Sequence, residues 1–296
     1  MIGVDSMVGR LDRVMMRRPG AILDADPRRW HYAHPIDAGA LARQFDGLVA
    51  TLQAHQVEID WLDDPDAPPD DGLADSVFTF DPSFVIPAGA LLLRPGKDLR
   101  RDEVGLHRAF YERTGTPIVG AIEAPGTVEG GDCCWIDRST LAVGRGARTN
   151  QSGIEQLSAL LRPHGIEVVA VDLPYLHGPE ACLHLLSILN PLDVDLALVH
   201  LPLVPYVLVE RLHEAGIELI DVPDDEFTSS NGLNVNVLAL APRRVLAIDG
   251  FPTTRKLMEH AGCEVDTFAA DELCLPCEGG PTCLTRPLTR QSTTAT

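Results

Sequence analysis

The hydrophobic positions switch between two periodicities in a fixed order along the chain. Segments with apolar residues every three or four positions, typical of amphipathic helices, run directly into short apolar stretches typical of strands. The five such strands begin near Glu58, Ile118, Glu167, Glu218 and Glu264. A recurrence at intervals of about 50 residues indicates a repeat architecture.

The segments between these helix–strand pairs resemble one another as well. Residues 83–96, 132–146 and 236–250 each contain two apolar runs around a polar turn, which predicts a β-hairpin. A glycine follows the last helical turn in four units, where a left-handed cap favours it: Gly115, Gly165, Gly216 and Gly262. Each unit is therefore ββαβ, in an α/β fold. We expect five units to close into a ring, with the helices outside and the strands around an axis.

The chain length of 296 residues by itself suggests about two domains. No linker separates two halves, however, and Pro and Gly are spread through the turns. Low-complexity sequence is confined to the short tail rich in Ser and Thr. We therefore predict one domain over residues 1–296.

The composition fits a globular protein, with 45% hydrophobic residues and 23% charged residues. The 43 acidic and 24 basic residues give a net charge of −19, which argues against a nucleic-acid partner and weakly favours a cationic ligand. We found neither an apolar run of membrane-spanning length nor a signal-peptide pattern, so we expect a cytoplasmic protein without membrane association.

The cysteines do not form a disulfide framework, because there are seven of them without a regular spacing. Cys274 and Cys277 form a CxxC pair, but the second CxxC or His pair of a zinc finger is missing. Reduced thiols are the expected state in the cytoplasm. We predict no metal and no organic cofactor.

Residues with catalytic chemistry lie at matching places in the repeat, in the loop after each unit's strand. They are Asp75, Asp81, Glu129, Asp132, His177, His184 and Cys283. Equivalent loops of a ring converge on its axis, so a thiol, imidazoles and carboxylates could form one covalent-catalysis site. Taken singly, each has a structural explanation: a histidine or cysteine in the core, or an acid capping a turn. Their shared place in the repeat favours the catalytic interpretation.

Several motifs together resemble dimethylarginine dimethylaminohydrolase and its relatives, the arginine deiminases and amidinotransferases. They are EAPGTVEGGD, LAVGRGARTNQSGIEQL, CLHLLS, NVLAL, GFPTTRKLMEHAG and GGPTC. The resemblance runs from about residue 10 to about residue 290. It implies the five-bladed α/β propeller called the pentein fold, and a cysteine-dependent reaction on a guanidino group.

The resemblance also implies roles for individual residues. Cys283 resembles the nucleophile, His184 the general acid/base, and Glu129 the carboxylate that positions the histidine and the guanidinium. The remaining assignments concern substrate contacts: Asp75 and Asp81 with the guanidinium, Arg94 and Arg148 with the α-carboxylate, and Leu23 in a loop that covers the substrate. A small cationic guanidino substrate is the implied partner, no cofactor is implied, and a homodimer is the expected assembly.

Two departures bear on the substrate. Deiminases and amidinotransferases have His-x-Asp in the third unit, whereas this chain has His184-Leu185-Leu186, like the dimethylarginine hydrolases. An alkylated substrate nitrogen offers fewer N–H donors, so it needs one carboxylate less. The second departure is Phe80, where the dimethylarginine enzymes commonly have Glu; this opens the choice of substrate to other N-substituted guanidines or amidines.

N-methylated arginine, converted to citrulline and an amine, is the predicted substrate. The alternatives are an arginine deiminase, an amidinotransferase, a hydrolase of another guanidino or amidino acid, and a non-catalytic binding protein. The last is known with this fold in ribosome biogenesis, and that role predicts loss of the Cys, His and Glu set. This chain retains all three.

Overall fold

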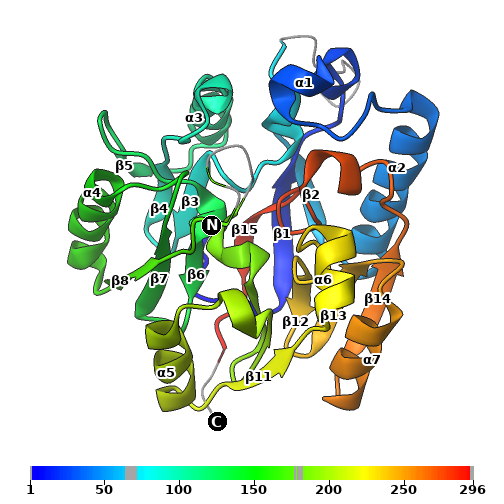
Figure 1. The fold of residues 1–296 in the computed structure, drawn as a ribbon. Helices are drawn as coiled ribbons and strands as arrows, with labels where there is room; N and C mark the ends of the chain where they lie inside the picture. Colours follow the sequence, from blue (N-terminus) through cyan, green and yellow to red (C-terminus); the bar gives the residue numbers. More distant parts are fainter. Residues whose placement is uncertain (1, 64–71, 177, 179–182, 294–296) are drawn as a thin grey trace.

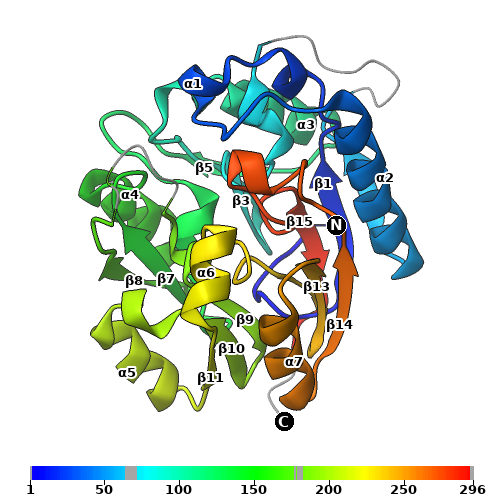
Figure 2. The same cartoon turned by 45° about the vertical axis from the view of Figure 1, so that its right-hand side comes forward.

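The computed structural model describes residues 2–63, 72–176, 178 and 183–293. Within them lie five three-stranded sheets, and in each sheet the middle strand pairs with both neighbours. Figures 1 and 2 show the sheets around a common centre with helices on the outside. The predicted α/β propeller of five ββαβ modules is confirmed.

Four modules are continuous in the sequence and share one pattern. A hairpin of two antiparallel strands is followed by a helix, and the third strand then pairs parallel to the middle one. The four sheets are β3 (Ser83–Ile86), β4 (Gly89–Leu92) and β5 (Ile118–Ala121); β6 (Cys133–Trp135), β7 (Thr140–Arg145) and β8 (Glu167–Asp172); β9 (Leu189–Asp193), β10 (Leu196–Val199) and β11 (Glu218–Asp221); and β12 (Leu238–Ala241), β13 (Arg244–Ile248) and β14 (Glu264–Phe268).

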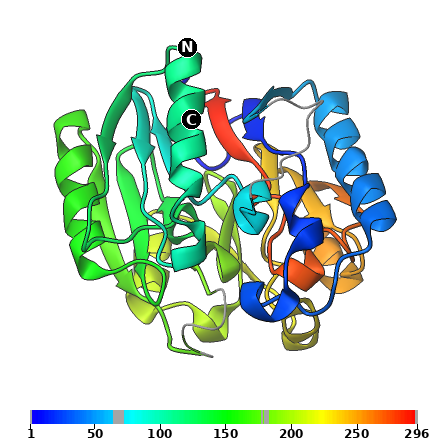
Figure 3. The ribbon, with the colours of Figure 1, turned by 90° about the horizontal axis from the view of Figure 1, so that it is seen from above.

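The fifth sheet joins the two ends of the described chain. Strand β1 (Leu11–Met16) pairs antiparallel with β15 (Arg286–Arg290) and parallel with β2 (Glu58–Trp61). Figure 3 shows the red strand β15 beside the blue N-terminal segment. This pairing closes the ring, and the hairpin of this module is thus split between residues that are some 270 positions apart.

The outer helices bury one apolar stripe each against their sheets, as their periodicity predicts. In α2 (Ala38–Ala54) the buried residues are Leu41, Phe45, Leu48 and Leu52. The other outer helices are α3 (Glu103–Arg113), α4 (Gln151–Leu161), α5 (Tyr206–Glu214) and α7 (Pro252–His260). Among the described residues, no helix combines the length and the apolar character needed to cross a membrane.

The predicted helix ends are also confirmed. The glycines after α3, α4, α5 and α7 have φ between 67° and 87°, in the left-handed region where a β-carbon is unfavourable. Two short helices, α1 (Pro27–Trp30) and α6 (Asp224–Ser230), interrupt loops that the sequence analysis did not predict to be helical.

One edge strand of each sheet lies nearest the axis of the ring. Side chains from β3, β6, β9, β12 and β15 line one shared cavity, which places these five strands around it. Loops that lead into them carry the candidate site residues, so the fold brings these loops together although they are far apart in sequence. His177 and Cys182 lie outside the described residues.

Candidate active site

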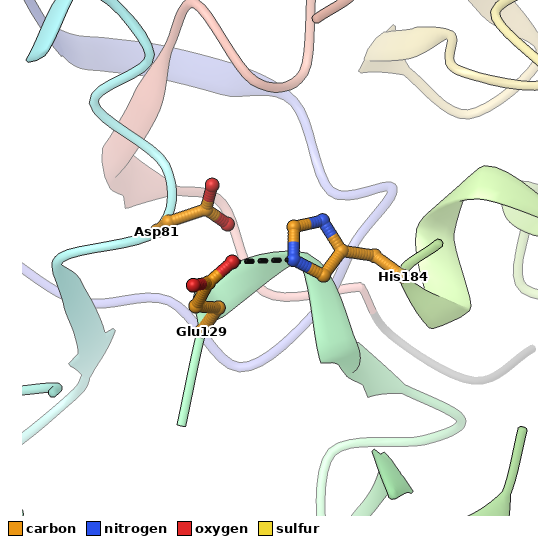
Figure 4. Close-up of side chains that lie close together, drawn as sticks. All are labelled: Asp81, Glu129 and His184. Carbon is orange, nitrogen blue, oxygen red and sulfur yellow. Dashed lines mark hydrogen bonds and ion pairs between the residues drawn. The ribbon is translucent and has the colours of Figure 1, made fainter. Parts of the chain in front are cut away.

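Glu129 and His184 form a buried pair at the entrance to two neighbouring modules. Glu129 precedes β6 and His184 precedes β9, and their side chains point toward one another (Figure 4). The Nε2–H of His184 donates to Oε2 of Glu129 over 2.7 Å. Gly131 makes this approach possible, because a β-carbon there would lie 2.4 Å from Nδ1 of His184.

Glu129 receives further hydrogen bonds on its other side. Its Oε1 accepts from the backbone amides of Gly96 (2.9 Å) and Lys97 (3.2 Å), and Arg148 donates to Oε2 over 3.1 Å. Burial alone would raise the pKa of Glu129, but Arg148 and the hydrogen bond from His184 more than offset it, so the pKa lies well below its usual range. Glu129 is therefore a carboxylate at neutral pH.

Asp81 lies beside Glu129, and both carboxylates face the imidazole of His184 (Figure 4). Its Oδ1 accepts from the amide of Gly131 (2.8 Å) and its Oδ2 from Nη1 of Arg100 (2.5 Å). Ligand atoms of Asp81, Glu129 and His184 lie within 4.8 Å of one another, a grouping that could hold a metal ion. Two guanidinium groups already neutralise these carboxylates, which makes the site a poor one for a divalent cation.

Cys283 joins the same loop cluster from the last module. Its carbonyl accepts from the amide of Phe80, the residue before Asp81, over 3.1 Å. Its Sγ accepts from Nδ2 of Asn236 over 3.3 Å, and Oδ1 of the same amide accepts from the Thr282 backbone. The second contact fixes the amide so that its N–H donors face the sulfur.

Asp75 is bound by two side chains from other loops. Oδ1 accepts from the hydroxyl of Tyr32 and Oδ2 from Nζ of Lys97, both over 2.6 Å. Burial and the nearby Asp75 carboxylate raise the pKa of Tyr32 far above its usual value, so the phenol keeps its proton and donates. Lys97 also donates to the carbonyl of Trp30, which ties the loop before α2 to the site.

The remaining predicted contacts lie at the edge of this cluster. Leu23 is 39% exposed in a short helix, Ala21–Asp24, that packs beside the helix Ala74–Val77 containing Asp75. Arg148 is in the cluster through Glu129, whereas Arg94 donates to the carbonyl of Gly126 over 3.1 Å. Within the described part of the chain, the guanidinium of Arg94 forms no ion pair with a site carboxylate.

Phe80 is buried in the core, 3% exposed. Its ring lies 3.7 Å from the guanidinium carbon of Arg286, and it packs with the buried side chains of Leu185 and Leu186. With Phe in place of Glu, this position has no acid, and the Phe80 ring instead covers the buried guanidinium of Arg286.

The sequence analysis missed five residues that bind within the cluster: Tyr32, Lys97, Arg100, Glu103 and Asn236. Arg100 lies in the charged run DLRRDE, which has the composition of a solvated helix start. It is in fact buried, and its guanidinium binds Glu103 as well as Asp81. The spacing of Arg100 and Glu103, one helical turn apart, is a signal that could have indicated an ion pair.

Comparison with known proteins places this site in a family. The family model described as arginine deiminase matches residues 71–206. The chain is 30% identical to N(G),N(G)-dimethylarginine dimethylaminohydrolase of Pseudomonas aeruginosa, over 92% of this chain and 97% of that one. It is 31% identical to the enzyme of the same name from Streptomyces coelicolor, over 90% and 95%. The chain belongs to the dimethylarginine dimethylaminohydrolase family.

Solved structures agree with this assignment. The dimethylarginine dimethylaminohydrolase of Pseudomonas aeruginosa, as a cysteine-to-serine mutant with citrulline, superposes with a TM-score of 0.74 at 25% identity, covering 95% of this chain and 100% of that one. An amidinotransferase from the saxitoxin pathway of Microseira wollei shares the fold, with a TM-score of 0.77 at 16% identity over 100% and 99% of the chains. The family is one of hydrolases that act on guanidino carbon–nitrogen bonds, and the resemblance seen in the motifs is confirmed.

Proposed function

We propose that this member of the dimethylarginine dimethylaminohydrolase family hydrolyses N-methylated arginine to citrulline and methylamine or dimethylamine. The observation that carries the proposal is the buried His184–Glu129 pair, 2.7 Å apart, in one loop cluster with Cys283. A thiol, an imidazole and an ordering carboxylate are the parts that nucleophilic catalysis requires. The names of the two relatives that cover nearly the whole chain support the same substrate class.

The charge of the cluster suits a cationic substrate. Four carboxylates, those of Asp75, Asp81, Glu103 and Glu129, are paired with three cations, those of Lys97, Arg100 and Arg148. Burial raises the pKa of Glu103 to about 8, although Arg100 opposes the shift, so this acid is largely protonated at neutral pH and the set is close to neutral. The Cys283 thiolate of the proposed reaction then adds one negative charge. An N-methylated arginine carries one net positive charge, because its guanidinium is added to a zwitterionic amino acid. Charge-assisted hydrogen bonds from the guanidinium to carboxylates would complete the balance.

The proposed reaction has two displacement steps at the guanidinium carbon. The Cys283 thiolate adds to that carbon, and the bond to the methylated nitrogen breaks as His184 delivers a proton to the departing amine. This leaves an S-alkylthiouronium on Cys283. His184 then removes a proton from water, which adds to the same carbon, and the carbon–sulfur bond breaks to release citrulline and restore the thiolate. Proton transfer of this kind typically contributes about 10²–10⁴ in rate.

Arg148 and Arg94 stay proposed contacts for the substrate α-carboxylate. Arg148 is held by Glu129 at 3.1 Å, and Arg94 begins the loop whose amides at Gly96 and Lys97 bind the same carboxylate. Both arginines thus flank the residue that positions His184. Leu23 is proposed to cover the substrate from the segment beside Asp75.

Arginine deiminase is the second candidate, because its family model matches residues 71–206. A deiminase releases ammonia from an unmodified guanidinium, which offers N–H donors on both terminal nitrogens. The buried, apolar Leu186 stands where the resemblance places the second carboxylate of a deiminase. An unmethylated nitrogen would lack that partner, which favours a methylated substrate.

The decisive experiment is a substrate panel. The purified protein is incubated with arginine, monomethylarginine, asymmetric dimethylarginine and symmetric dimethylarginine, and citrulline is measured by mass spectrometry. We expect citrulline from monomethylarginine and asymmetric dimethylarginine, with a much higher kcat/KM than for arginine. A preference for arginine would assign a deiminase, and failure with all four would remove the proposed substrate class.

Replacement of the nucleophile tests the mechanism. Cys283→Ser should lower kcat by about 10³-fold or more while leaving the melting temperature nearly unchanged, because serine is isosteric but a far weaker nucleophile here. Cys277→Ser is the matched control: both thiols are partly buried, but Cys277 has no place in the proposed reaction. Equal activity of the two variants would contradict the role of Cys283.

A further inference from the structure

A small cavity lies at the centre of the ring, between strands of all five sheets and next to the loops of the candidate active site. It has a volume of about 20 Å³ and is lined by residues from one strand of each sheet: β3, β6, β9, β12 and β15. At one end it touches Phe80 and Thr282, which precede Asp81 and Cys283 in the chain. This volume is enough for one water molecule or one monoatomic ion.

The charged side chains that line this cavity are all positive. Its lining contains two guanidinium groups, those of Arg286 and Arg290, and no carboxylate. Both side chains are buried, 2% and 6% exposed. The carboxylate that acts on Arg286 is Asp81, and that acid is already paired with Arg100 at 2.5 Å. Two buried cations beside one another without an internal counter-charge are costly.

Hydrogen-bond donors in the lining are left without acceptors as well. Nε of Arg286 and the indole Nε1 of Trp135 have no partner among the described residues, although both are shielded from solvent. Arg290 uses Nη1 on the carbonyls of Gly9 and Ala239. Buried N–H groups are nearly always satisfied in folded proteins, and an unmet donor is unfavourable.

We propose that this axial cavity is a binding site for a monoatomic anion, with chloride the physiological ligand, held by Nε of Arg286 and Nε1 of Trp135 beside Arg290. A chloride ion supplies the missing counter-charge and accepts from several N–H donors at once. A water molecule fits the volume but brings no charge. The proposal concerns stability at the centre of the ring and is independent of the substrate proposed above.

The guanidinium groups stay charged at neutral pH, which the anion site requires. Burial lowers the pKa of Arg286 to about 10 and that of Arg290 to about 9, and the positive charge of Arg286 contributes to the second shift. Both values lie above 7, so neither group escapes the cost of burial by losing its proton.

Crystallography with bromide tests occupancy in the unmodified protein. Crystals are grown or soaked in sodium bromide, and data are collected at the bromine absorption edge. We expect an anomalous peak in the axial cavity within hydrogen-bonding distance of both Nε of Arg286 and Nε1 of Trp135. A cavity without anomalous density, while bromide appears elsewhere on the protein, overturns the proposal in favour of water.

Thermal unfolding tests whether the anion binds in solution. Chloride replaces gluconate at constant ionic strength, since gluconate is too large for the cavity. The melting temperature should rise with chloride, by about 4–5 °C once chloride exceeds its dissociation constant a hundredfold. A melting temperature that stays constant across the replacement contradicts the proposal.

Two variants locate the effect. Trp135→Phe keeps an aromatic ring against Phe84 and removes the N–H, so the half-saturating chloride concentration should rise about tenfold or more. Trp61→Phe, at a tryptophan outside the cavity lining, is the control and should leave it unchanged. Phe80→Glu places a carboxylate against Arg286 and should abolish the chloride response. An equal response in Trp135→Phe and Trp61→Phe would overturn the assignment to this cavity.

Discussion

At the scale of single residues, Glu129 is the centre of the candidate site. Its two oxygens accept from four donors: the amides of Gly96 and Lys97, the guanidinium of Arg148 and the imidazole of His184. These donors fix the carboxylate from opposite sides. The carboxylate in turn fixes which nitrogen of His184 is protonated, because the bonded Nε2 must carry its hydrogen.

Glu129→Gln tests this positioning role. Glutamine has nearly the same shape, but its neutral amide cannot stabilise the positive charge that His184 carries during proton transfer. We expect kcat for the methylated arginine to fall by roughly 10²–10⁴, a larger effect than on KM. Steady-state kinetics with the best substrate of the panel measures both constants.

The control for this variant is Glu123→Gln, at an exposed acid of the preceding loop. It should have wild-type kinetics. Because Arg148 loses an ionised partner in Glu129→Gln, the melting temperatures of both variants are measured alongside. A Glu129→Gln enzyme that keeps its kcat would show that His184 is oriented by other contacts.

At the scale of elements, the guanidinium of Arg100 connects three segments of the chain. Its guanidinium binds Glu103 at the start of α3, Asp81 at the entrance to β3, and the carbonyl of Phe78 at the end of the helix Ala74–Val77. Glu103 is fully buried, so Arg100 is its compensating charge.

Arg100→Met should therefore destabilise the protein strongly. It leaves the buried carboxylates of Glu103 and Asp81 without their cation, and breaking a buried pair in this way costs about 3–5 kcal/mol. Arg101→Met changes the adjacent residue, whose bridge to Asp98 is exposed, and should cost about 0–1 kcal/mol. Urea unfolding measures both, and a loss below about 1 kcal/mol for Arg100→Met would contradict the importance of this ion pair.

The elements were largely predictable from the sequence. All five strands after a helix begin at the residues that the change of periodicity indicated, from Glu58 to Glu264. The reason is local: an amphipathic stripe, a left-handed cap and an apolar run are properties of neighbouring residues. The sequence analysis did not predict that β1 pairs with β15. These strands lie far apart in the sequence, so no pattern of neighbouring residues indicates their pairing.

The sequence analysis identified Asp75, Asp81, Glu129, His184, Cys283 and Arg148 as site residues, but it did not identify Lys97, Arg100 or Glu103. Asp81, Glu129 and His184 meet because their loops occupy equivalent places in the repeat. Lys97 and Arg100 belong to a charged run whose burial depends on loops of other modules closing over it. A pattern within one run cannot reveal such burial.

At the scale of the whole molecule, contacts between neighbouring modules hold the ring together. Asp132, at the entrance to β6, accepts from the backbone amide of Leu185 in the next module over 3.1 Å. The side chain is fully buried, and burial raises the pKa of Asp132 from 3.8 to about 6. The folded protein therefore resists ionisation of this acid.

This shift makes stability depend on pH. Between about pH 4 and pH 6 the unfolded chain releases the Asp132 proton while the folded protein keeps it, so the free energy of unfolding falls as the pH rises. The stabilising contribution is fully present below the unfolded pKa of 3.8 and is lost as the pH passes about 6. A shift of this size corresponds to about 3 kcal/mol.

Asp132→Asn removes the titrating group and keeps an oxygen for the Leu185 amide. We therefore expect the variant to gain about 3 kcal/mol relative to the wild type between pH 4 and pH 7, measured by urea unfolding at each pH. Asp137→Asn is a control of opposite sign. Partial burial opposes the shift there, but hydrogen bonds from Ser139 lower the pKa of Asp137, so this variant loses relative stability as the pH rises. Parallel curves for Asp132→Asn and the wild type would mean that Asp132 ionises as freely in the ring as in the unfolded chain.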